Sequence, residues 1–214
     1  TYAFKPRVAP VTDLIDEIME NISYETINTS CDIAIEKGSY PQFEGSDWSN
    51  GILPIHKANQ EVHKLLSPER LYNTRRQDWV KLSIKVSENG MRNGYLMAIA
   101  PTSSISILVG TTQAIEPVYK RKWFEENQSG QIPVVVPNLS PNTWNFYTPA
   151  YEVDQLDIIR ASAIRQQWID QGQSTNIFMS LDKASGKYLH EIYTLAWKLG
   201  LKSTYYLKNR SKLS

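Results

Sequence analysis

The stretch YLMAIA at residues 95–100, followed directly by PTSSIS at residues 101–106, decides the fold class that the sequence predicts. The first six residues are almost continuously apolar, which is typical of a short buried strand. Pro101 has no N–H and a fixed φ, so it suits the turn or first helical position after the strand. The small hydroxyl residues that follow favour a helix start. A strand that passes through a tight turn into a helix is a building unit of α/β proteins.

The rest of the chain continues this alternation. Residues 1–11 are expected to be an irregular lead-in, and residues 123–151, rich in Pro, Gly, Asn and Ser, an excursion of loops and short strands. The sequence predicts five further helices: one from Thr12 or Asp13 through Ile22, three over residues 24–36, 78–86 and 155–170, and one from Ser185 to Gly200. It also predicts strands over residues 175–180 and 201–207. We therefore expect one α/β domain, a layer or a barrel, over residues 1–214.

Size and composition exclude several classes of protein. With 214 residues, 41% hydrophobic and 21% charged, the chain can bury one sizeable core. A net charge of +1 provides no field for nucleic acid, and no apolar run reaches the roughly 20 residues of a membrane helix. We expect neither partner, and a cytoplasmic location. Cys31 is the single cysteine and is expected in the core; His56, His63 and His190 lack metal-ligand spacing, so no metal site is expected.

The turn after residue 100 has the features of an anion site. The first N–H groups of a helix have no intrahelical acceptor, and the helix dipole favours negative charge there. Hydroxyls of Thr102, Ser103, Ser104 and Ser106 can add donors. The alternative is ordinary N-capping by Ser or Thr, which needs no ligand. The pattern is not a Walker loop, because the sequence has no Gly-x-x-x-x-Gly-Lys.

Tyr205 and Tyr206 form a second candidate site. Adjacent residues of a strand point to opposite faces, so one phenol can face a barrel interior and the other an interface. Adjacent phenols can carry redox chemistry. The alternative is that they only pack, as aromatic residues of strands usually do.

Five segments together resemble the C-terminal part of the large, catalytic subunit of class I ribonucleotide reductase. They occur in the family's order, and the resemblance covers roughly residues 12–210. The segments are 31–43 with GILP at 51–54, MRNG at 91–94 with APTSSIS at 100–106, IEP at 115–117, QQWIDQ at 166–171 with STN at 174–176, and KSTYY at 202–206.

The resemblance implies a fold and an activity. The fold would be the C-terminal half of a ten-stranded α/β barrel, and the activity reduction of ribonucleoside diphosphates by a radical mechanism. Backbone amides of the loop Pro101, Thr102, Ser103, Ser104 and Ile105 would hold the substrate diphosphate. Tyr205, the inner member, and Tyr206, the outer one, would relay a radical from a small subunit that carries the metal-radical cofactor. The chain would bind no cofactor directly, and a thiol reductant of the thioredoxin or glutaredoxin type would supply electrons.

The chain also departs from this family. The family uses a cysteine that becomes a thiyl radical and a reducing cysteine pair, and Cys31 lies in none of those motifs. We therefore expect a portion that needs the N-terminal portion of the large subunit and is inactive alone. The alternative is a non-catalytic nucleotide- or phosphate-binding module derived from that fold. A small hydrolase has no support, because neither Gly-x-Ser-x-Gly nor His-Glu-x-x-His occurs.

Overall fold

The computed structural model describes residues 8–74, 76–128, 130–180 and 184–210, and its longest element is α1 (Val8–Lys37). The two helices predicted in this region are one, because no Gly or Pro interrupts residues 11–37. Ser23, at the predicted break, is fully buried within the continuous helix. The irregular lead-in predicted over 1–11 is wrong for residues 8–11, which are helical; residues 1–7 lie outside the described residues. Pro10 is tolerated because a first-turn N–H has no intrahelical acceptor.

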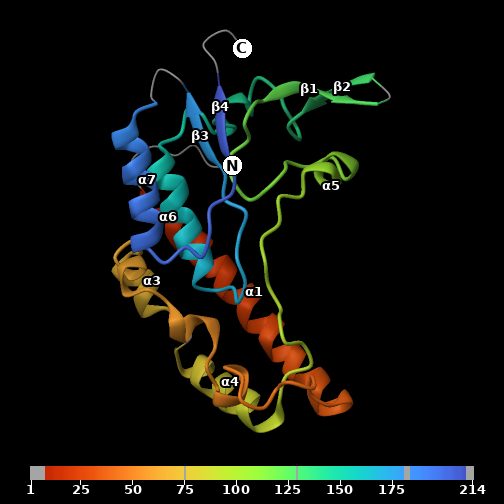
Figure 1. Cartoon of the computed structure of the whole chain (residues 1–214), viewed down its shortest axis with the longest axis vertical. Coiled ribbons are helices and arrows are strands. Elements are labelled where there is room, and N and C mark those ends of the chain that lie inside the picture. The colour runs from red at the N-terminus through yellow and green to blue at the C-terminus, as the bar shows by residue number, and fades with distance from the viewer. Residues whose placement is uncertain (1–7, 75, 129, 181–183, 211–214) are drawn as a thin grey trace.

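Short helices and strands follow α1 along the chain (Figure 1). They are the 3-10 helices η1 (Trp48–Asn50), η2 (Pro54–Lys57) and η3 (Trp144–Phe146), the helices α2 (Gln60–His63), α3 (Pro68–Tyr72), α4 (Arg76–Asn89), α5 (Ser103–Leu108), α6 (Gln155–Gln166) and α7 (Gly186–Lys198), and the strands β1 (Lys122–Asn127), β2 (Gly130–Val135), β3 (Ile177–Ser180) and β4 (Leu207–Arg210).

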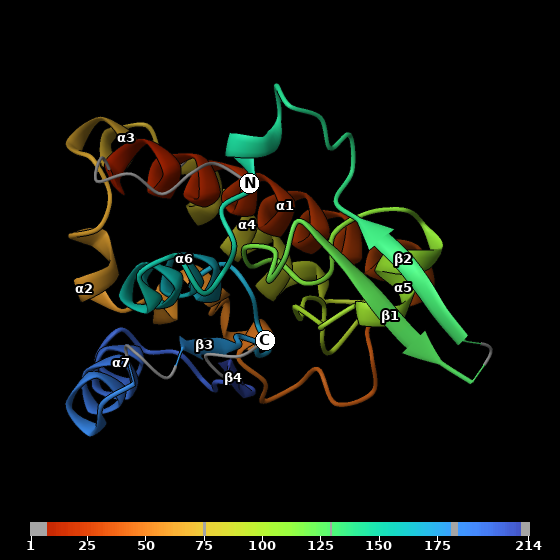
Figure 2. The same ribbon diagram turned by 90° about the horizontal axis from the view of Figure 1, so that it is seen from above.

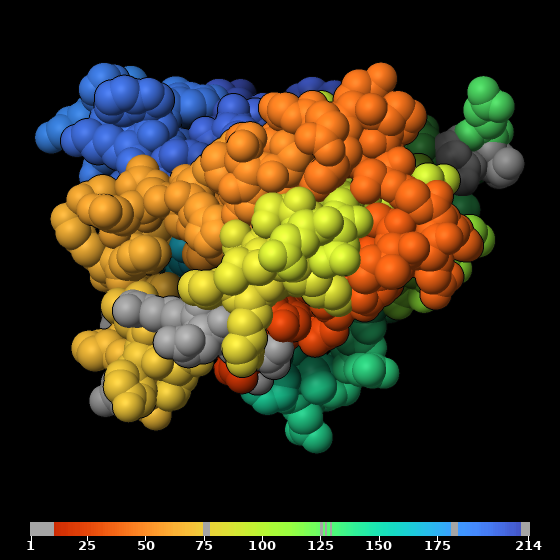
Figure 3. Space-filling view, turned by 90° about the horizontal axis from the view of Figure 1, so that it is seen from below, coloured from red at the N-terminus to blue at the C-terminus, as the bar shows by residue number. Residues whose placement is uncertain are grey.

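The first core lies where α1 packs against α4 and α6. Trp79 of α4 stacks on Trp168 just after α6, with ring centroids 5.5 Å apart. Cys31 is fully buried in the same cluster, as predicted for a core residue. Figure 3 shows the molecule from below, where the orange segment after α1 and the yellow helix α4 cover much of this end. This core anchors the helical base of the molecule.

The second core joins α6 and α7 to strand β3. The predicted start of α7 is confirmed, because the Ser185 hydroxyl accepts from the Tyr188 N–H at 3.1 Å. Its predicted end is confirmed as well: Gly200 has φ +80, a left-handed conformation that suits glycine. Local capping chemistry therefore fixes both ends of the helix beside the strands.

Parallel pairing connects three segments that are distant in the sequence. β3 pairs with β4 from Ile177 opposite Leu207 to Ser180 opposite Arg210. Upstream, Ile99 forms an isolated parallel bridge with Gln173. The predicted strand at 95–100 is thus reduced to one bridge, and its burial is interrupted: Met97 is buried while Tyr95 is largely exposed. The architecture is α/β, as predicted; over the described residues the parallel pairing consists of the β3–β4 sheet and one isolated bridge, and no closed barrel forms.

The region predicted as loops and short strands contains the antiparallel hairpin β1–β2, which pairs from Lys122 opposite Val135 to Asn127 opposite Gly130. Figures 1 and 2 show the hairpin extending from the side of the molecule that also carries α5. This side presents exposed apolar residues: Ile105, Leu108, Val109, Phe124 and Val135.

Candidate functional site

The loop that precedes α5 is built around a left-handed residue. Thr102 has φ +50, and the helix begins at the next residue, Ser103, as the sequence predicts. The Thr102 hydroxyl oxygen accepts from the Ala114 N–H at 3.2 Å, and the Pro101 carbonyl accepts from the same N–H at 3.1 Å. The Thr102 side chain is therefore engaged by a distant loop rather than by its own helix.

The first turn of α5 faces solvent. Ser103, Ser104 and Ile105 are all exposed, and their N–H groups belong to the positions that have no intrahelical acceptor. Ser106 differs: it is buried, and its hydroxyl donates to the Ser103 carbonyl at 2.7 Å. Its expected role as an additional donor to an anion is wrong for this geometry. What remains available to an anion is the set of backbone N–H groups at 103–105 with the exposed hydroxyls of Thr102, Ser103 and Ser104, since the Thr102 hydroxyl accepts from Ala114 and keeps its own proton to donate.

The tyrosine pair lies just before β4, not within it. The Tyr205 N–H donates to the Thr175 carbonyl at 2.8 Å, and the Tyr206 carbonyl accepts from the Ile177 N–H at 2.9 Å. The two rings lie side by side, with centroids 4.1 Å apart and planes tilted by 52°. The prediction that the phenols point to opposite faces is therefore wrong, because strand alternation does not apply before Leu207.

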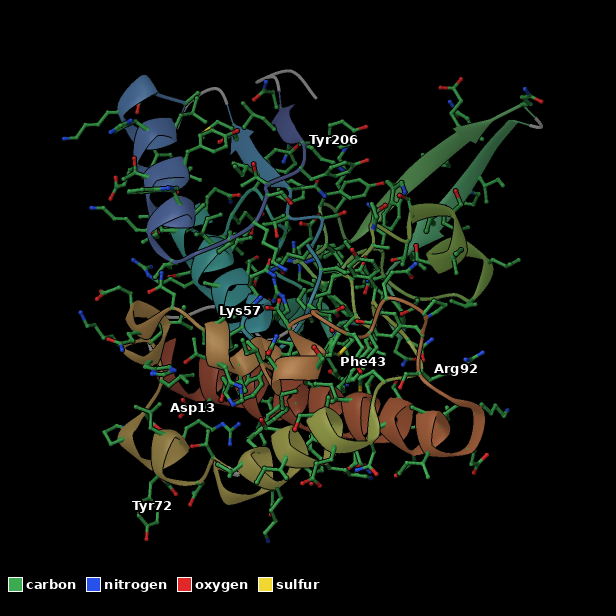
Figure 4. The ribbon with its side chains drawn as sticks, turned by 60° about the horizontal axis from the view of Figure 1, so that its bottom comes forward. Asp13, Phe43, Lys57, Tyr72, Arg92 and Tyr206 are labelled. Carbon is green, nitrogen blue, oxygen red and sulfur yellow. The ribbon has the colours of Figure 1, made fainter. Side chains whose placement is uncertain are left out.

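Both phenols are accessible, with 46% of Tyr205 and 58% of Tyr206 exposed. Figure 4 shows Tyr206 at the end of the molecule where β3 and β4 lie, far from Tyr72 of α3. A hydrogen bond with Tyr206 raises the pKa of Tyr205 above its ordinary value. The two phenols therefore contact each other, are about half exposed, and are held in place by backbone hydrogen bonds.

Glu116 and Asn176 connect the two candidate sites, and sequence reasoning gave neither residue a role. One Glu116 oxygen accepts from the Asn176 backbone N–H at 2.9 Å, and the other accepts from the Asn176 side-chain amide. Burial raises the pKa of Glu116, while the Asn176 hydrogen bonds, Lys208 and Arg165 act in the opposite direction. The signal in the sequence was their place in two segments that carry the family resemblance, IEP at 115–117 and STN at 174–176.

Arg165 of α6 is a buried cation close to this carboxylate. Its guanidinium donates to the Gln173 amide oxygen at 3.2 Å and to the Ser162 hydroxyl at 2.9 Å. Burial lowers the pKa of Arg165 to about 10, and Glu116 opposes that shift. Glu116, which binds Asn176, therefore has a buried guanidinium as a charged neighbour.

Other reactive groups have structural surroundings. Burial raises the pKa of the Cys31 thiol, and the thiol lies 3.6 Å from the Lys85 carbonyl, so the sulfur is a poor nucleophile. Over the described residues, no group of three or more His, Cys, Asp or Glu side chains could hold a metal ion. No helix in the same part of the chain is long and apolar enough to span a membrane.

Comparison with known proteins shows the family of this chain. The family model described as ribonucleotide reductase, barrel domain, matches residues 9–207. The chain therefore belongs to the ribonucleotide reductase barrel-domain family.

Relatives with curated names are alpha subunits of ribonucleoside-diphosphate reductase. The protein of that name from Helicobacter pylori strain J99 is 66% identical over 197 residues, which cover 92% of this chain and 25% of the relative. The Treponema pallidum protein of the same name is 40% identical over 196 residues, covering 92% of this chain and 21% of the relative. The chain thus spans about a quarter of the length of the curated relatives it matches.

Proposed function

We propose that this chain is the C-terminal portion of a ribonucleoside-diphosphate reductase alpha subunit, and that it contributes the substrate phosphate loop and a tyrosine radical relay. Family membership gives the reaction class. The observation that carries the role of this portion is the open first turn of α5. Ser103, Ser104 and Ile105 are exposed residues whose N–H groups have no intrahelical acceptor, and the Ala114 N–H donates to the Thr102 hydroxyl oxygen beside them. A diphosphate is a suitable ligand for such a helix start.

The proposed reaction replaces a ribose hydroxyl by hydrogen, and the hydroxyl leaves as water. Two electrons come from an external dithiol of the thioredoxin or glutaredoxin type, which becomes a disulfide. A small partner subunit with a metal-radical cofactor supplies the radical. Tyr206, the more exposed phenol, would receive it, and Tyr205 would pass it inward. Each phenol loses an electron and its phenolic proton as the radical arrives, and the close ring contact favours exchange between them.

The proposal requires thiols from the N-terminal portion of the subunit. The chain has one cysteine, and Cys31 is fully buried in the core. We therefore expect the purified chain alone to give no turnover of CDP with a dithiol reductant. Mixing it with the complementary N-terminal portion and the small subunit should restore turnover.

The same experiment separates the proposal from the alternative of a non-catalytic phosphate-binding module. An assembly that binds CDP but gives no deoxy product would support the module. Turnover by the chain alone would contradict the assignment of the reducing thiols to another portion. Turnover that appears only in the complete mixture supports the proposal.

A further inference from the structure

Both carboxylate oxygens of Glu116 accept hydrogen bonds from the same residue, Asn176. One accepts from the Asn176 backbone N–H at 2.9 Å, and the other accepts from the Asn176 side-chain Nδ2. Asn176 is 4% exposed, so its amide has little water with which to replace these bonds. A planar amide whose nitrogen is held on one side must present its oxygen on the other. Glu116 therefore determines where the Asn176 oxygen points.

That oxygen holds the tyrosine pair. Asn176 Oδ1 accepts from the Tyr206 N–H at 3.3 Å. The neighbouring bonds from Tyr205 to Thr175 and from Ile177 to Tyr206 are backbone pairings that any side chains would permit. The Asn176 contact is the one whose geometry depends on a side chain, and that side chain depends on Glu116.

The segment that carries Glu116 also touches the loop before α5. Two residues earlier, the Ala114 N–H donates to both the Pro101 carbonyl and the Thr102 hydroxyl. Ala114 has φ +56, a conformation that a residue with a Cβ adopts only when its surroundings hold it. Residues 114–116 therefore form a short, constrained connection between the loop and Asn176.

The mostly apolar surroundings of Glu116 indicate that its carboxylate serves to form hydrogen bonds rather than to fill space. It lines a cavity of about 320 Å³ whose other walls are mostly apolar residues of α1 and α6, with Arg165 as a charged neighbour. A neutral apolar residue would fit these walls better, whereas the acceptors required by Asn176 need a carboxylate. The side chain thus has a specific hydrogen-bonding task.

We infer that Glu116 is a positioning residue for the tyrosine pair: through Asn176 it fixes the backbone of Tyr206, and through residues 114–116 it joins that pair to the loop at 101–105. The inference deepens the proposed function and rests on it for its biological meaning. The structural relationship itself is measurable in this chain without any turnover.

The experiment compares Glu116→Gln with Asp170→Asn in the chain itself. Glutamine has nearly the same shape but places an NH₂ group where one Asn176 donor needs an acceptor. Asp170 is a matched control, because its carboxylate also accepts two N–H groups, from Leu96 and Met97, at 2.9 and 2.7 Å. Amide hydrogen exchange is read by NMR at Tyr206, and the titration of Tyr205 is read as the absorbance difference between each protein and its Tyr205→Phe form.

We expect Glu116→Gln to accelerate exchange of the Tyr206 amide by roughly tenfold, the effect of losing one hydrogen bond. The pKa of Tyr205 should fall toward its ordinary value as the pair loosens. Asp170→Asn should leave both readouts unchanged even where it lowers the melting temperature. Equal acceleration in both variants, or no acceleration in Glu116→Gln, would overturn the inference.

A second variant keeps the test decisive if Glu116→Gln folds poorly. Asn176→Ala retains the backbone N–H to Glu116 and removes both side-chain bonds, so Tyr206 exchange should accelerate equally. Because Glu116 and Asn176 act on Tyr206 through the same hydrogen bonds, the Tyr206 amide should exchange no faster in the Glu116→Gln/Asn176→Ala double variant than in Asn176→Ala. Additive effects would overturn the inference. Failure of the reassembled wild-type mixture to turn over CDP would instead count against the proposed function, with the exchange results unaffected.

Discussion

The Asp16 carboxylate and the Trp168 indole, 152 residues apart in the sequence, are joined by a hydrogen bond of 2.7 Å. Asp16 is fully buried, and it also accepts from Gln167 Nε2 at 2.5 Å and from Arg70 Nε at 2.7 Å. Burial raises the pKa of Asp16, whereas the Trp168 bond and Arg70 lower it. This carboxylate ties α1 to α3 and to the residues directly after α6.

Replacing Arg70 by Met should destabilise the chain strongly. Arg70 also donates to Glu20, and both carboxylates are almost completely buried. Removing the cation leaves buried negative charge without its main counter-ion, a change that costs about 3–5 kcal/mol. Urea unfolding followed by circular dichroism gives the difference. Lys57→Met is the control, since its pair with Asp47 is more than half exposed and should contribute about 1 kcal/mol or less. If Arg70→Met and Lys57→Met lower the free energy of unfolding equally, burial does not determine how much the ion pairs of Arg70 contribute to stability.

Replacing Tyr205 or Tyr206 by Phe should show whether each phenol contributes to packing or to radical transfer. Phe keeps each ring, and both phenols are largely accessible, so the loss of stability should be small. Phe is much harder to oxidise and has no phenolic proton, so each variant should abolish turnover in the reassembled enzyme. Melting curves and activity are measured on the same samples. Normal activity in either variant would remove that tyrosine from the relay.

Charge placed at the start of α5 should reveal whether it holds a phosphate. Ser104→Asp adds a negative charge beside the exposed amides and should weaken CDP binding to the reassembled enzyme by roughly tenfold or more. Ser104→Ala should change binding little, because the backbone donors remain. Ser87→Asp on the exposed face of α4 controls for net charge. Calorimetry that finds equal affinity for Ser104→Asp and the wild type would reject the site.

Stability should depend on pH through Glu116. Its folded pKa is raised above the ordinary value of 4.5, so the folded state binds the proton more tightly than the unfolded state. The stability gained from that protonation is complete below pH 4.5 and is lost as pH rises through the folded pKa. Arg165 and Lys208, which face the carboxylate, limit the shift.

The measurement is the unfolding free energy of wild type minus that of Glu116→Gln across this pH window. The difference should decrease with rising pH, since the variant lacks the titrating group. A difference that increases with pH would show that Glu116 is stabilised as the anion and that its folded pKa is lowered rather than raised.

Features that depend on neighbouring residues, such as helix ends, can be predicted well from this sequence. Features that depend on contacts between distant segments can be predicted less well. Ser185 and Gly200 predict the ends of α7 because each acts through its own backbone neighbours. The start of α5 at Ser103 is predicted for the same reason. Tyr205 and Tyr206 have strand-like composition, yet their rings lie side by side because pairing with residues 175–177, not composition, sets their backbone.

In the candidate site, too, the features set by neighbouring residues can be predicted and the contacts between distant residues cannot. N–H groups without an intrahelical acceptor after Pro101 follow from helix geometry and can be predicted from that stretch alone. The bond between Glu116 and Asn176 spans 60 residues, and nothing in either local sequence specifies the other. Asp16 is similar: nothing in the surrounding sequence predicts its burial, nor the indole and the guanidinium that donate to it.

The separation of Asp16 from Trp168 also has a consequence for biosynthesis. At about 5–20 residues per second, a ribosome needs roughly 8–30 s to extend the chain by the 152 residues between them. During that interval α1 has left the ribosome while its acidic and apolar side chains still lack the indole of Trp168. We therefore expect holding chaperones to bind the nascent helix, and we expect codon changes that slow translation between α1 and α6 to lower the yield of native protein.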